Sequence, residues 1–100
     1  MIILNTTFFA EEAIAPAVLG WLRDVYVKSV EAAGLFTDVE LVRVIEPSEP
    51  GAVSFACRCA CGSLEAARSW HDSSAVIVRD ELHRLWGQRA LWFTTYMERL

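Results

Sequence analysis

The spacing of apolar residues alternates along this chain between the two-residue period of a strand and the three-to-four-residue period of a helix. Short segments rich in β-branched and aromatic residues are separated by two longer segments that carry one apolar stripe each. Strands are predicted at 2–9, 36–45, 52–61 and 90–99, and helices over about 13–33 and 63–87. The predicted order of strand, helix, strand, strand, helix, strand constrains the fold more than any other feature.

Turn and capping residues support these boundaries. Pro16 is compatible with the first helix only in its first turn, where no backbone N–H is needed. Gly34 lies where a left-handed cap would end that helix, and Ser63 is a candidate N-cap for the second helical region, which we expect to bend at 72–74. The segment E-P-S-E-P-G at 46–51 predicts a turn, so the strands on either side of it should form an antiparallel hairpin.

This order is that of the split β-α-β unit of ferredoxin-like folds. We therefore predict an α+β fold of the order β-α-β-β-α-β, with a four-stranded antiparallel sheet and two helices on one face. One hundred residues are enough for a single domain, 1–100. The strands carry apolar residues on both faces and 54% of all residues are hydrophobic. We predict that the uncovered sheet face pairs with a second copy of the chain to form a homodimer.

Charge and hydropathy exclude several classes of function. The net charge is −4, and residues 1–50 hold eight acidic but only three basic side chains, so no nucleic-acid partner is expected. Charged residues interrupt every stretch long before the ~20 apolar residues that span a bilayer, so no membrane segment is expected. The first residues lack the basic region of a secretory signal, which predicts a cytoplasmic location.

All three cysteines lie within five residues, as Cys57, Cys59 and Cys61. On a strand they point to one face, with side chains about 6.5 Å apart. A tetrahedral zinc ion needs sulfur atoms less than about 4 Å apart, and a disulfide between such neighbours is unfavourable as well. We predict that the three thiols are small buried core side chains beneath the helices, and that the protein uses no metal or other cofactor.

Histidine and aromatic residues supply the candidates for a binding site. His83 lies beside the apolar stripe of the second helical region, where it would reach the mouth of a pocket between helix and sheet. Trp92 and Tyr96 share one face of the last strand and would line an apolar pocket that has a phenol as its polar group. The alternatives are a solvated or capping histidine and aromatic packing at the dimer interface. His71, beside the predicted bend, is expected to have a structural role.

Three stretches of the chain resemble a known family: M-I-I-x-N at the start, A-x-G-L-F from Ala32 to Phe36, and L-W-G-Q-R-A-L-W-F-T-T-Y-M-E from Leu85 to Glu98. An uncharacterised bacterial family of hundred-residue ferredoxin-like proteins reads roughly M-I-I-Y-N-V-T, A-T-G-L-F and R-F-G-x-K-F-V-A-F-R-T-L-L-E there. The resemblance implies a fold related to dimeric α/β-barrel proteins and carries no assigned reaction.

The first helix departs from that family. Where its members have a histidine followed two residues later by a proline, this chain has Tyr26 and Lys28. A phenol has an ordinary pKa near 10, so Tyr26 would not replace the histidine as a base near neutral pH.

Three hypotheses about function agree with these observations. The first is a homodimeric domain that binds a small apolar or aromatic ligand between sheet and helices. The alternative is a cofactor-free enzyme of the dimeric α/β-barrel type, a monooxygenase or isomerase acting on a small organic molecule, and a plain interaction module is the third. The candidate pocket residues in either ligand hypothesis are His83, Trp92, Tyr96 and Tyr26. The enzyme hypothesis needs an enclosed cavity with a titratable group of shifted pKa.

Overall fold

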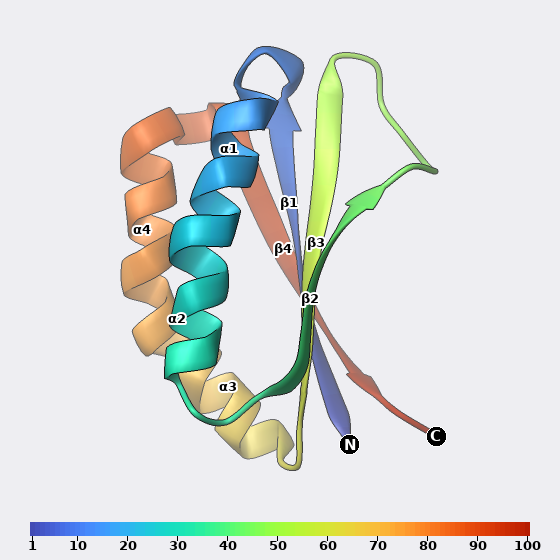
Figure 1. The fold of residues 1–100 in the computed structure, drawn as a ribbon, viewed down its shortest axis with the longest axis vertical. Coiled ribbons are helices and arrows are strands. Elements are labelled where there is room, and N and C mark those ends of the chain that lie inside the picture. The colour runs from blue at the N-terminus through green and yellow to red at the C-terminus, as the bar shows by residue number, and fades with distance from the viewer.

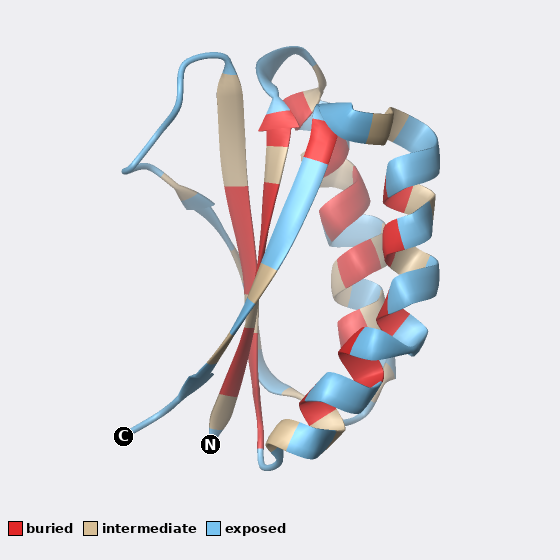
Figure 2. Ribbon diagram, turned by 180° about the vertical axis from the view of Figure 1, so that it is seen from behind, coloured by how far each residue is buried: buried red, intermediate tan, exposed pale blue.

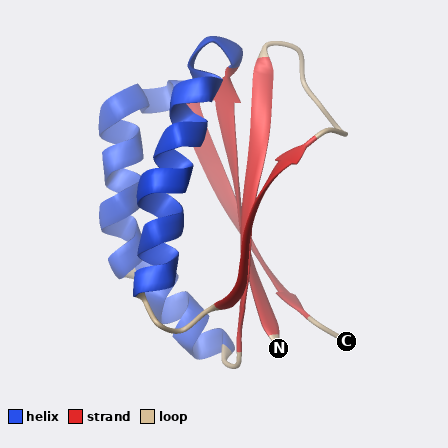
Figure 3. Cartoon of the chain, in the orientation of Figure 1, coloured by secondary structure: helices blue, strands red, loops and turns tan.

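A four-stranded antiparallel sheet lies against a single layer of helices in the computed structural model, which describes all residues 1–100 (Figures 1 and 3). The strands are β1 (Ile2–Glu11), β2 (Thr37–Val44), β3 (Ala52–Cys61) and β4 (Ala90–Glu98). Their order in the sheet is β2-β3-β1-β4, which leaves β2 and β4 at the edges. The predicted α+β class and the predicted antiparallel hairpin of β2 and β3 are confirmed.

The helical layer is built from two segments that are each divided. The first consists of a 3-10 turn and α1 (Ala15–Trp21), a π-helical turn at Leu22–Tyr26, and α2 (Val27–Ala32). The second consists of α3 (Leu64–Asp72) and α4 (Ser74–Trp86), followed by a 3-10 turn. The division between α3 and α4 falls at the predicted bend. The Ser73 hydroxyl donates to the Ser69 carbonyl, an alternative to helix continuation that serine commonly adopts.

The predicted caps are present. Pro16 is in the first turn of α1, and Gly34 has a φ of 69° at the end of α2. The Ser63 hydroxyl accepts a hydrogen bond of 3.1 Å from the Ala66 amide at the start of α3. None of the helices combines the length and the apolar character needed to cross a bilayer.

Strand register decides which side chains face the helices. Phe8 of β1 is paired with Phe55 of β3 and with Trp92 of β4, and residues paired in this way point to the same face. The helix-facing side of the sheet holds the core, whose buried members include Leu4, Phe8 and Phe55 together with residues from every helix (Figure 2).

The three cysteines are part of this core. Cys57, Cys59 and Cys61 are 2%, 3% and 4% exposed and none forms a disulfide, so the prediction of buried free thiols is confirmed. Burial raises the pKa of Cys57 and of Cys59 to about 12. Both thiols therefore stay protonated and unreactive at neutral pH.

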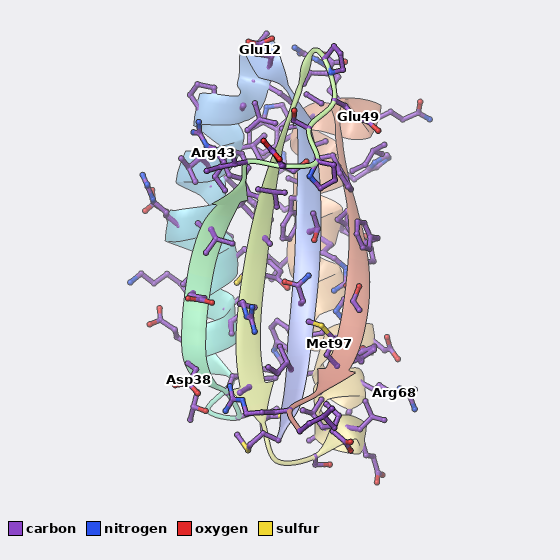
Figure 4. All side chains as sticks on the ribbon, turned by 90° about the vertical axis from the view of Figure 1, so that its right-hand side faces the viewer. Glu12, Asp38, Arg43, Glu49, Arg68 and Met97 are labelled. Atoms are coloured by element: carbon purple, nitrogen blue, oxygen red, sulfur yellow. The ribbon has the colours of Figure 1, made fainter.

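The opposite side of the sheet, here called the open sheet face, has no helix over it (Figures 3 and 4). Phe93 of β4 stacks there on Phe9 of β1, with 5.6 Å between the ring centroids. Four large apolar side chains are exposed on this face: Leu91 (54%), Phe93 (49%), Met97 (40%) and Val42 (39%).

Candidate ligand-binding site

A cavity of about 300 Å³ opens between α4 and the helix-facing side of β4. Because β4 is an edge strand, the helices cover it incompletely, and Trp92 is 40% exposed although it points toward the helical layer. We call this cavity the β4 cleft, and its lining residues are Arg79, Leu82, His83, Ala90, Leu91 and Trp92. Four of these six residues are apolar, and the other two carry a guanidinium and an imidazole.

Arg79 is held in place by His71. Its two terminal nitrogens donate to the His71 backbone carbonyl at 2.7 Å and to the His71 ring nitrogen Nδ1 at 3.1 Å. The carbonyl belongs to the last turn of α3, where backbone acceptors lack helical partners. The break at Ser73 lets α4 bring Arg79 back to this end of α3. Both residues are buried, with 7% and 6% of their surface exposed.

The contact with Arg79 determines the protonation state of His71. A guanidinium can only donate, so Nδ1 accepts and the proton of the neutral ring is on Nε2. Burial lowers the pKa of His71 below its ordinary value of 6.5, and the Arg79 charge lowers it further. His71 is therefore uncharged at neutral pH.

Aromatic rings line the sheet side of this cluster. The Arg79 guanidinium carbon lies 4.3 Å from the centre of the Trp92 ring, a cation–π contact. The His71 ring meets Trp92 and Tyr96 edge-on, with centroid distances of 5.6 and 6.1 Å. Arg68 lies over the Tyr96 ring at 5.6 Å. Burial raises the pKa of Tyr96, so its phenol remains a hydrogen-bond donor at neutral pH.

A short polar chain continues from β4 into the core. Thr94, which lies between Trp92 and Tyr96 on β4, shares a hydrogen bond of 3.0 Å with Thr6, and the Tyr26 hydroxyl donates to Thr6 at 3.4 Å. Burial raises the pKa of Tyr26 far above its ordinary value, and only 1% of the residue is exposed. Tyr26 ends the π-helical turn of the first helical segment, a feature that is common at functional sites.

The structure brings only some of the predicted site residues together. His83 and Trp92 line the same cavity, and Tyr96 lies farther along the same strand face, against His71. Tyr26 lies in the core and reaches β4 only through Thr6 and Thr94. The sequence analysis did not identify Arg79 as a site residue. The only signal for it in the sequence is its position one turn before His83 on a helix with an apolar stripe.

Other parts of the surface offer less specific chemistry. A wider hollow of about 600 Å³ lies between α2 and the α3–α4 junction, and no charged side chain lines it. No group of three or more histidine, cysteine or acidic side chains is arranged to hold a metal ion. The β4 cleft is the place where exposed aromatic surface and buried polar groups meet.

Comparison with known protein families assigns the chain to a family. The sequence model of a domain of unknown function, DUF4286, matches residues 1–100. The chain belongs to the DUF4286 family. This confirms the predicted membership in a family of uncharacterised function. No curated protein matches the DUF4286 chain in sequence.

Solved structures with the same fold cover nearly the whole DUF4286 chain. A candidate antibiotic biosynthesis monooxygenase from Deinococcus radiodurans aligns with a TM-score of 0.74 and 17% identity over 99% of this chain and 92% of its own. An ethyl tert-butyl ether d family protein from Bacillus halodurans aligns with a TM-score of 0.72 and 11% identity over 100% of both chains. A mutant of MhuD with two manganese protoporphyrin IX molecules per active site aligns with a TM-score of 0.59 and 18% identity over 98% and 94%. These likenesses show the ferredoxin-like fold.

Proposed function

We propose that this DUF4286 protein is a homodimeric domain that binds a small aromatic organic molecule in the β4 cleft of each protomer. The observation that carries the ligand proposal is the Trp92 ring, which is 40% exposed on the side of the sheet that otherwise forms the core. Ligand sites are commonly concave and apolar, with a few placed polar groups, and the β4 cleft has this composition. Its volume of about 300 Å³ is at the lower end of the usual range and suits a ligand of one or two rings.

The structural neighbours give independent support for this class of ligand. MhuD is a protein of this fold with a planar aromatic macrocycle bound in its active site. The Deinococcus radiodurans neighbour is described as a candidate antibiotic biosynthesis monooxygenase. A planar organic ligand at the β4 cleft agrees with the ligand of MhuD, and the small cavity favours one much smaller than a porphyrin.

The contacts of His71 favour binding over proton abstraction by this residue. Its free nitrogen Nε2 already carries the proton, and a second proton would create an imidazolium whose Nδ1 is 3.1 Å from a nitrogen of the Arg79 guanidinium. A cofactor-free monooxygenase or isomerase is the second candidate function. Within the β4 cleft that candidate would depend on His83 as its base.

The homodimer is supported by the open sheet face. Strands of about ten residues and four strands side by side give a face of roughly 34 by 19 Å, or about 650 Å² before side-chain relief. Pairing of two such faces would bury about 1,300 Å² in total, which is at the lower end of the roughly 1,200–2,000 Å² that specific interfaces bury. Arg58 and Glu40 form an ion pair at 3.4 Å on this face, in register with Asn5 and Thr95, so a polar row crosses the four strands between the apolar side chains of the face.

The test of the ligand proposal uses 2-naphthalenemethanol as a neutral two-ring probe. We expect saturable shifts of the backbone amide signals of the cleft residues in ¹H–¹⁵N NMR spectra, and an affinity at least about ten-fold lower in Trp92→Ala, because the stacking surface is lost. Ile77→Ala is the matched control, since Ile77 is 76% exposed on the outer side of α4. Shifts that are absent, or equal in both variants, would refute the proposal.

A further inference from the structure

We propose that the β4 cleft selects an anionic ligand, an aromatic carboxylic acid whose carboxylate is bound by Arg79. This inference rests on the proposed function of the cleft and adds the charge of the ligand and the residue that recognises it. The reason is that the buried Arg79 cation has no anionic partner within the protein.

Arg79 is a buried cation without an anionic partner. Only 7% of the residue is exposed. Charged side chains are rarely buried to this extent unless an opposite charge is beside them. The protein forms five ion pairs, all between side chains that are at least 40% exposed, and Arg79 takes part in none of them. The nearest acidic residues in sequence are Asp80, which is exposed to solvent, and Glu81, which pairs with Arg84; Asp72, beside His71, is exposed as well.

The guanidinium also has donors to spare. Its bonds within the protein are the two to His71, one to the ring and one to the carbonyl. A guanidinium carries more N–H donors than these two, arranged in a planar fork that matches a carboxylate. Because Arg79 lines the β4 cleft, the remaining donors are available to a molecule bound there.

The Trp92 ring lies next to the Arg79 charge, so one ligand could contact both groups. The guanidinium carbon is 4.3 Å from the Trp92 ring centre, while 40% of Trp92 remains exposed. A ligand ring that packs on the exposed part of Trp92 would hold a directly attached carboxylate within reach of Arg79. Aryl carboxylates have this short separation between ring and charge.

Other charges around the cleft agree with an anion. His83 is a further donor in the lining, and Arg68 lies over the Tyr96 ring on the same side of the sheet. The net charge of the chain is −4, which would repel an anion at long range. Asp72 and Asp80 are close enough to stabilise the charged form of Arg79, but both are exposed to solvent, which weakens their repulsion of an anion in the cleft.

The test compares two ligands that differ only in charge, 2-naphthoate and 2-naphthamide, by isothermal titration calorimetry. We expect wild-type protein to bind the carboxylate about ten-fold or more tightly than the amide, because a charge-assisted hydrogen bond is added. Arg79→Gln should weaken 2-naphthoate binding by about ten-fold or more and 2-naphthamide binding by much less, so that the preference for the carboxylate is lost. Arg84→Gln is the control, because it removes the same charge from an exposed position on α4.

The outcomes separate the two proposals. Equal affinity for both ligands in wild-type protein would overturn the anion inference and leave the aromatic site intact. Binding of neither ligand would overturn the proposed function itself. The wild-type comparison needs no variant, so it decides the inference even if Arg79→Gln fails to fold.

Discussion

Replacement of Phe93 by serine is expected to dissociate the proposed dimer, because this ring is in the apolar band of the open sheet face. An aromatic side chain can bury about 200 Å², and Phe93 is 49% exposed in the protomer, so the dimer would cover about 100 Å² of it. At about 25 cal/mol per Å² this amounts to about 2.5 kcal/mol. A two-fold interface contains the residue twice, so the loss is about 5 kcal/mol and the dissociation constant rises by more than about a thousand-fold.

Sedimentation velocity over a concentration series measures this dissociation constant directly. Ile77→Ser is the matched control, since it removes a comparable exposed apolar side chain from the outer side of α4. Circular dichroism checks that Phe93→Ser remains folded despite the lost stacking on Phe9, whose ring centroid lies 5.6 Å from that of Phe93. A wild-type protein that is monomeric at about 100 μM, or a variant with an unchanged dissociation constant, would refute the reasoning.

Two further predictions concern the polar groups around β4. Thr6→Val keeps the shape of the side chain but removes the oxygen that accepts a hydrogen bond from Tyr26. The free energy of unfolding, measured by heat or urea, should fall by about 1–3 kcal/mol because the buried Tyr26 hydroxyl loses its partner. A fall of less than about 0.5 kcal/mol would contradict this account. The pKa of folded His71 is lower than its ordinary 6.5, so the unfolded chain binds more protons, and stability should be complete above 6.5 and fall as the pH drops below it. His71→Gln, which keeps an acceptor for Arg79, should flatten this slope in melting temperatures measured from about pH 7.5 to 5.5, and an equal slope in both proteins would exclude His71 as its source.

Local signals account for most of the fold. The E-P-S-E-P-G turn predicts the β2–β3 hairpin, and Ser63 and Gly34 mark helix ends by capping chemistry that involves only neighbouring residues. The two-residue period of β4 also predicts that Trp92 and Tyr96 share a face. The predicted helix over 13–33 overlooked the π-helical turn at Leu22–Tyr26, because one extra residue in a turn leaves no clear trace in an apolar stripe.

The centre of the candidate site could not be predicted in this way. His71 and Arg79 are eight residues apart on segments that both appear helical, and their contact depends on the direction that α4 takes after Ser73. A bend can be predicted from Asp72-Ser73-Ser74, but its direction is set by packing of α4 on β4. The same holds for Tyr26, whose burial depends on how the first helical segment lies over Thr6.

The alternation of β4 connects the two proposed interactions. Leu91, Phe93 and Met97 point to the open sheet face, while Trp92 and Tyr96 point to the helices. An edge strand with apolar residues on both faces would be an aggregation hazard in a protomer alone. Pairing of the open sheet face would remove one apolar surface, and a ligand in the β4 cleft would cover part of the other. The excess of apolar residues on this strand is therefore explained by two partners, one on each face.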